Sequence, residues 1–161
     1  MQRKRWLAIV ASMLLGLIFV AAGLGKLLQH AEVFRIYFAS YPSYLLDLLP
    51  PAFFEAIFVW LPRIELIIGL SIIISITAKL VAAFSLLLIA GFIANNSWLL
   101  SQGLEYESCG CFGMIESITQ ARISTVSALY LDIGMLVLVV IILLYYPGKF
   151  ITVRPWFLVR G

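Results

Sequence analysis

The chain has 161 residues, enough for one domain and hardly for two. Hydrophobic residues make up 63% of it and charged residues only 12%, whereas soluble domains have roughly 45–50% and 25%. So few polar groups cannot cover the apolar surface of such a chain, which excludes a soluble globular protein and makes the lipid bilayer the expected solvent. The net charge of +3 is therefore not a sign of nucleic-acid binding, and we expect no nucleic-acid partner.

Four apolar runs in the chain are candidates for membrane spans, because a helix needs about 20 apolar residues to cross a hydrocarbon core of about 30 Å. The N-terminal run is longer than the apolar core of about 7–15 residues in a signal peptide, so we interpret it as an uncleaved first helix. The runs are apolar nearly all round, as is typical of membrane helices. The predicted spans are Trp6–Leu28, Pro62–Ile76, Leu80–Leu100 and Ile123–Tyr146, in a single domain of residues 1–161. Glycines expected to permit close helix approach are Gly16, Gly23, Gly69 and Gly91.

The connection between the first two spans, Gln29–Leu61, is long and rich in aromatic residues, and Pro42, Pro50 and Pro51 interrupt it. Aromatic rings are enriched at membrane interfaces, so we expect one or two short interfacial helices here. The alternative is a longer, proline-kinked second span that begins near Ala52.

Basic residues indicate the orientation, because cytoplasmic loops carry an excess of Lys and Arg. One side has Arg3, Lys4, Arg5, Lys79, Lys149, Arg154 and Arg160, and the opposite loops have only Arg35 and Arg122. Both termini are therefore predicted to be cytoplasmic and the loop Ser101–Arg122 extracytoplasmic, in a bacterial inner membrane. The predicted fold class is all-α: an integral membrane four-helix bundle with short interfacial helices in the first extracytoplasmic loop.

The two cysteines of the chain lie in that loop, in the string Cys109-Gly110-Cys111-Phe112-Gly113. Three interpretations are open. A structural disulfide would stabilise little, because crosslink stabilisation depends on the length of the closed loop. A zinc site falls short, because two thiols and the single His30 do not make four ligands, and no metal is expected. A redox-active dithiol fits best, because close spacing strains the disulfide and makes it easier to reduce.

Four sequence strings resemble those of a known family, and they are spread in order over residues 22–134, which is most of the chain. They are Ala22–Leu27, Leu61–Gly69, Cys109–Gly113 and Leu129–Gly134. In this order they resemble the MauE-type methylamine utilisation proteins within the DoxX-like membrane protein family. The resemblance implies a redox-associated protein that acts with a thioredoxin-like partner and is linked to maturation of the disulfide-rich small subunit of methylamine dehydrogenase. It also implies that Cys109 and Cys111 carry the exchange.

Polar residues within the predicted spans form a second candidate feature. A charge at mid-bilayer costs roughly 2.5–3.5 kcal/mol on insertion scales, so such residues usually face the bundle interior and pair. On the predicted topology they gather in the outer half of the spans, beneath the cysteine loop. One interpretation is ion pairing that locks the bundle, and the other is a pocket that relays protons or holds a quinone, the one candidate cofactor. The predicted pocket residues are Lys26, Arg63, Glu65, Asn95, Asn96, Asp132 and, at the end of the loop, Arg122.

The sequence favours a membrane thiol–disulfide oxidoreductase component, in which Cys109 and Cys111 pass electrons between an extracytoplasmic thioredoxin-like protein and an acceptor in the membrane. A first alternative is a non-catalytic assembly factor that uses the cysteine loop as a docking surface. A second is a small transporter with Lys26, Glu65 and Asp132 as its ion or substrate site, which the lack of visible repeats disfavours. The expected partners are the lipid bilayer and the thioredoxin-like protein, and the sequence makes no prediction of oligomeric state.

Overall fold

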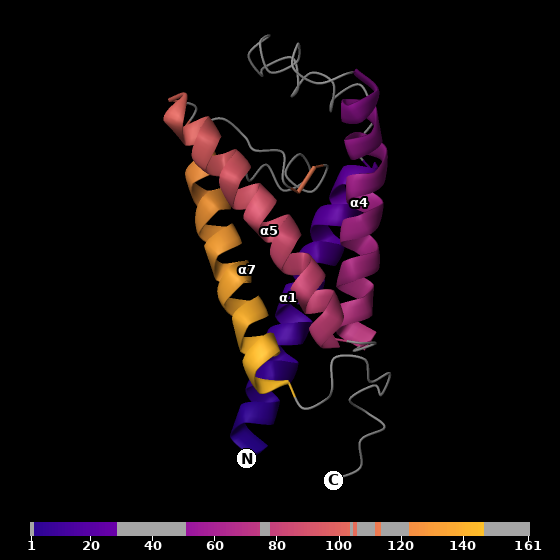
Figure 1. Cartoon of the computed structure of the whole chain (residues 1–161), viewed down its shortest axis with the longest axis vertical. Coiled ribbons are helices and arrows are strands. Elements are labelled where there is room, and N and C mark those ends of the chain that lie inside the picture. Colours follow the sequence, from indigo (N-terminus) through magenta and orange to yellow (C-terminus); the bar gives the residue numbers. More distant parts are fainter. Residues whose placement is uncertain are drawn as a thin grey trace.

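The computed structural model describes residues 2–28, 51–74, 78–103, 105, 112–113 and 123–146. These residues form four long helices, drawn in Figure 1: α1 (Gln2–Leu28), α4 (Pro51–Ile74), α5 (Ala78–Ser101) and α7 (Thr125–Tyr145). The predicted all-α fold class is confirmed. The interfacial helices expected in the first loop fall mainly on residues 29–50, which lie outside the described residues.

Successive helices run in opposite directions (Figure 1). Helices α1 and α5 start at the end of the bundle where the N-terminus lies, and α4 and α7 return to it. The connections from α1 to α4 and from α5 to α7 therefore both leave from and return to the opposite end. We call this end the connection end.

Helix α4 is the element whose bounds differ most from the prediction. It begins at Pro51, whereas the predicted span begins at Pro62. The longer second helix, given above as the alternative, is thus the arrangement found. Proline is well tolerated at the first position of a helix, because its missing N–H would have no partner there. Pro62 lies inside the helix and removes one backbone hydrogen bond, but the helix continues through it.

The outward surface of the helices is apolar, as a lipid environment requires. Within the described residues, three segments are long and apolar enough to cross a membrane: Trp6–Leu28, Lys79–Ser101 and Thr125–Tyr145. Helix α4 has 24 residues and packs along α1, so it lies in the same apolar layer. Large apolar side chains exposed on the four helices include Leu7, Val10, Leu14, Leu17, Ile64, Ile67, Leu70, Phe84, Leu87, Ile133, Val137 and Leu144. The protein is therefore an integral membrane protein.

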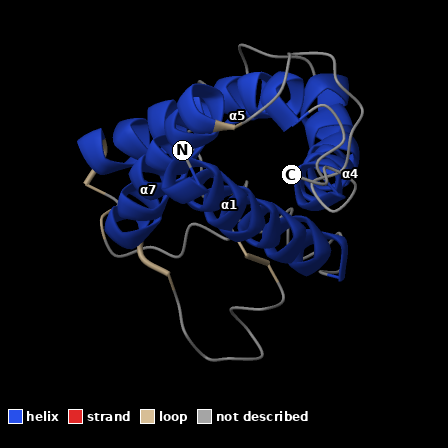
Figure 2. Cartoon of the chain, turned by 90° about the horizontal axis from the view of Figure 1, so that it is seen from below, coloured by secondary structure: helices blue, strands red, loops and turns tan. Residues whose placement is uncertain are grey.

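Viewed along the bundle, the four helices form a ring in the order α1, α4, α5, α7 (Figure 2). The most extensive contact is between α1 and α4, followed by α5 with α7 and α1 with α7, and the contact between α4 and α5 is the smallest of the four. An apolar core fills the half of the ring nearer the N-terminus. Its members come from all four helices and include Ala11, Leu15, Ile72, Ile89, Val139 and Ile142.

Glycines explain why α1 and α4 pack so closely. A Cβ atom added to Gly69 would lie 2.8 Å from the carbonyl oxygen of Gly16, and one added to Gly23 would lie 2.8 Å from that of Pro62. These separations are shorter than a real Cβ contact allows, so only glycine fits, as in other membrane helix pairs built on small residues. The expectation of close approach is confirmed for Gly16, Gly23 and Gly69. It is wrong for Gly91, which is exposed and has no atom within 4 Å of an added Cβ.

Candidate functional site

An ion pair between α1 and α4 is the first component of the site. The Lys26 Nζ atom lies 2.5 Å from the Glu65 Oε1 atom, and the two side chains are only 8% and 1% exposed. The glycine contact brings them together, because Gly23 is three residues before Lys26 and packs against the backbone of Pro62 and Leu66, which flank Glu65. The pairing agrees with the prediction that charges within the spans face the interior and pair.

A hydrogen bond between α5 and α7 is the second component. The Asn96 amide nitrogen donates to the Asp132 Oδ2 atom over 2.7 Å, and both side chains are buried. Asn96 precedes the end of α5 at Ser101 by five residues, and Asp132 follows the start of α7 at Thr125 by seven, so each lies about 7–11 Å from the connection end at 1.5 Å per residue. The carboxyl group of Asp132 is thus held by a neutral partner, unlike that of Glu65.

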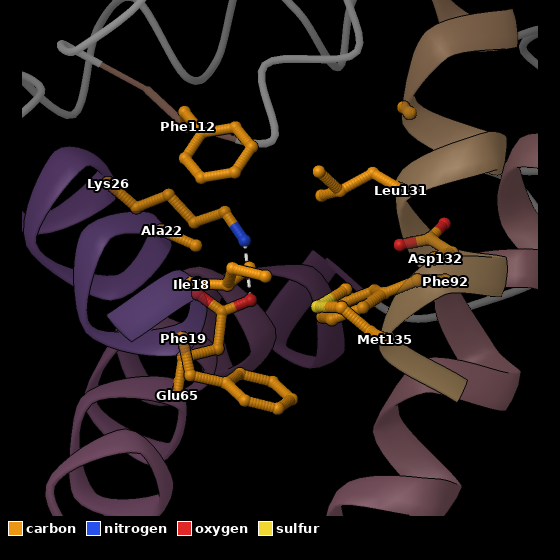
Figure 3. Close-up of a pocket in the computed structure, with 11 residues that line it drawn as sticks. Ile18, Phe19, Ala22, Lys26, Glu65, Phe92, Phe112, Leu131, Asp132 and Met135 are labelled. Carbon is orange, nitrogen blue, oxygen red and sulfur yellow. Dashed lines mark hydrogen bonds and ion pairs between the residues drawn. The ribbon is translucent and has the colours of Figure 1, made fainter. Parts of the chain in front are cut away.

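A cavity of about 40 Å³ lies between these two components, and we call it the chamber (Figure 3). All four helices contribute to its wall, and Lys26 also lies over the ring of Phe92, with 5.3 Å from Nζ to the ring centroid. This volume suits a few water-sized molecules. The lining residues are Ile18, Phe19, Ala22, Lys26, Glu65, Phe92, Phe112, Ala128, Leu131, Asp132 and Met135.

Phe112 brings the cysteine-containing connection to the chamber. It directly follows Cys111 in the chain and lines the cavity beside Lys26 (Figure 3). The next residue, Gly113, is buried and has a φ angle of 51°, a conformation that glycine adopts without strain. Cys109, Cys111 and Arg122 themselves lie outside the described residues.

One carboxylate oxygen at the chamber has no hydrogen-bond partner. Glu65 is fully buried, and its Oε2 atom is the single buried side-chain nitrogen or oxygen without a partner among the described residues. Leaving such a group unsatisfied costs roughly 1–3 kcal/mol, and more when the group is charged. The buried ion pair therefore leaves one strong acceptor unsatisfied next to the chamber.

Three of the predicted pocket residues that the structure describes do not line the chamber. Asn96 lies behind its wall, where it holds Asp132, and the other two face away from it. Arg63 is exposed on α4, where its guanidinium lies 5.6 Å from the centroid of the Trp60 ring. Asn95 is exposed on α5. Helical geometry explains both positions, because side chains one or two residues apart point about 100° or 200° away from each other. Once Glu65 and Asn96 face the interior, Arg63 and Asn95 cannot.

The apolar part of the wall was not predicted as part of the site. Phe92 lies four residues before Asn96 on α5, and Ala128 and Met135 lie four residues before and three after Asp132 on α7. Residues at these spacings share a helix face. The spacing around Asn96 and Asp132 was thus the signal that could have found them, whereas nothing in the sequence indicated Phe112.

The fold and the site define a multi-pass α-helical membrane protein with a buried ion pair and a polar chamber toward one end of its bundle. The chain belongs to the MauE family, since the family model described as methylamine utilisation protein MauE matches residues 4–145. This range includes the chamber residues and both cysteines, and it associates the protein with methylamine utilisation. No curated protein and no solved structure matches the chain.

Proposed function

We propose that this protein is the membrane component of a thiol–disulfide exchange system in methylamine utilisation. Cys109 and Cys111 exchange with an extracytoplasmic thioredoxin-like protein and with an acceptor in the bilayer. Oxidation of the two thiols forms one S–S bond and releases two protons and two electrons. A quinone is a suitable class of acceptor, because it takes up two protons and two electrons to become a quinol. The reverse exchange balances in the same way.

The observation that carries this proposal is the position of Phe112. The residue that follows Cys111 forms part of the wall of a chamber that also contains Lys26, Glu65 and Asp132. Because Phe112 directly follows Cys111 in the sequence, we propose that the dithiol acts next to the polar groups of this wall. A purely structural crosslink would not need such a neighbourhood, whereas a group that exchanges electrons and protons does.

The fold also supports the proposed orientation. The N-terminal arm contains Arg3, Lys4 and Arg5, and α1 runs from there to the connection end (Figure 1). If the basic arm is cytoplasmic, the connection between α5 and α7, which contains both cysteines, is extracytoplasmic. In a bacterial inner membrane the exchange would then occur on the side where disulfides persist.

The chamber sets a condition on a quinone acceptor. A cavity of about 40 Å³ has room for a few water-sized molecules but not for a quinone ring. A ring could enter only if side chains of the wall moved aside. The α4–α5 side, where contact between neighbouring helices is smallest, is the expected approach from the lipid.

Trapping of mixed disulfides tests the proposal. We expect either Cys109→Ser or Cys111→Ser to leave one thiol that forms a stable mixed disulfide with the thioredoxin-like protein, visible on a non-reducing gel. Ser108→Ala, next to the pair, serves as the matched control and should behave as wild type. The proposal fails if no mixed disulfide forms and the double Ser variant supports methylamine-dependent growth fully. Retained partner binding by that functional double variant would instead support the assembly-factor alternative.

A further inference from the structure

The charges that face the chamber do not balance. Helix α1 contributes the ammonium group of Lys26, α4 the carboxyl group of Glu65 and α7 that of Asp132. Helix α5 contributes the ring of Phe92 and, behind the wall, the neutral amide of Asn96, and the connection contributes Phe112. No second basic side chain lines the chamber among the described residues. With both carboxyl groups ionised the chamber would have a net charge of −1 inside the membrane, where an uncompensated charge is strongly disfavoured.

We infer that the chamber is a proton-binding site, in which the carboxyl groups of Glu65 and Asp132 together hold one exchangeable proton. Lys26 neutralises one carboxylate, and the proton neutralises the other. The Glu65 Oε2 atom agrees with a bound proton, because it is a fully buried acceptor that has no hydrogen-bond partner. A bound proton requires no larger cavity than the one present.

The contacts favour Asp132 as the residue that holds the resting proton. Glu65 has a direct ion pair with Lys26 at 2.5 Å, which favours its ionised form. Asp132 receives only the neutral amide of Asn96. The two carboxyl groups lie on opposite sides of the chamber (Figure 3), so a proton would pass between them through a water-sized donor.

The role of this proton rests on the proposed function, although its presence does not. Two thiols release two protons, and a quinone acceptor takes up two protons with its two electrons. Asp132 gives its proton to the acceptor and regains one released by the thiols, while the other thiol proton goes to the acceptor. The chamber thus returns to its starting charge after each turnover, with Asp132 as the proton-transfer residue.

Infrared spectroscopy of the full-length protein in lipid vesicles tests the inference, because protonated and ionised carboxyl groups absorb at different frequencies. At neutral pH we expect one protonated buried carboxyl group, identified by its frequency shift in D₂O. Asp132→Asn and Glu65→Gln should each abolish the signal, because the single remaining carboxylate then balances Lys26. Lys26→Met should instead double the signal, because both carboxyl groups must then be neutral.

Two sets of controls separate this inference from the proposed function. Arg63→Gln changes a charge outside the chamber on the same helix as Glu65 and should leave the signal unchanged. The double variant with Cys109→Ser and Cys111→Ser should also retain it, even if the thiol exchange proves wrong. A wild-type spectrum without a protonated carboxyl group would overturn the inference, and so would a signal that persists in both Asp132→Asn and Glu65→Gln. The wild-type spectrum decides the matter even if a variant fails to fold.

Discussion

The two halves of the bundle are built from the same four helices but packed in opposite ways. Near the N-terminus, Ala11, Leu15, Ile72 and Val139 belong to a closed apolar core. Toward the connection end, the helices enclose polar side chains and a cavity. Burying an ion pair adds little or no stability compared with apolar packing. The comparison indicates that the apolar half and the glycine contact hold the fold, and it leaves the polar half as the candidate site for the proposed chemistry.

Loss of the buried ion pair should give the largest change in stability, and it tests the contrast between the two halves. We expect Glu65→Ala to destabilise the protein by about 3–5 kcal/mol, because it removes the only carboxylate that contacts the buried Lys26 ammonium group within the described residues, and Asp132 can balance that charge only from across the chamber. Arg63→Ala, two residues away on the exposed side of α4, should cost about 1 kcal/mol or less. Unfolding of both variants in mixed micelles with a denaturing detergent measures the difference. Equal effects would show that the ion pair is not the buried element described here.

The glycine contact should give the next largest effect. Gly69→Ala places a Cβ atom against the backbone of Gly16 and Val20 and should cost about 1–3 kcal/mol through overpacking. Gly91→Ala is the matched control, because its Cβ atom meets open space. Alanine should stabilise the helix there by up to about 1 kcal/mol. The same detergent unfolding curves report both, and a destabilised Gly91→Ala would contradict the packing described for α5.

The hydrogen bond in the polar half should contribute less to stability. Asn96→Ala removes the donor to Asp132, and interhelical hydrogen bonds of this kind in membranes are worth about 0.6–1.7 kcal/mol. Ser97→Ala, exposed on the next position of α5, is the control and should be close to neutral. If the two variants unfold alike, Asn96 does not hold Asp132.

Asp132→Asn should have the smallest effect on stability but a large effect on the rate of thiol oxidation. Asp132→Asn keeps the shape of the side chain and its contact with Asn96, so we expect a destabilisation of about 1 kcal/mol or less. Loss of a proton-transfer group typically slows a reaction by about 10²–10⁴-fold. Stopped-flow measurement of thiol oxidation in vesicles should show slowing of this order, while mixed disulfides with the partner still form. A wild-type rate would remove Asp132 from the mechanism.

The sequence predicted the helices better than it predicted their faces. Uniformly apolar spans indicate a membrane helix clearly, and α1, α5 and α7 lie close to the predicted ranges. The same uniformity hides which side faces inward, so Arg63 and Glu65 could not be told apart by pattern. The start of α4 was uncertain for a related reason, because Pro51 and Pro62 can each begin a helix or lie within one.

The chamber was predictable only in part. Lys26, Glu65, Asn96 and Asp132 were expected to gather because an isolated charge in a membrane is costly, and the structure brings them to one region in two separate pairs. The cavity between the pairs depends on how four helices tilt against each other. The contact of Phe112 with the chamber depends on the path of the connection between α5 and α7. Local sequence patterns predict neither the cavity nor this contact.

The most direct test of the account is differential alkylation of Cys109 and Cys111 in native membranes, before and after addition of the reduced thioredoxin-like protein. The account predicts that both thiols are protected from alkylation beforehand and become reactive together afterwards, since the S–S bond between them is exchanged. The contradictory result is a pair of cysteines whose reactivity is the same under both conditions.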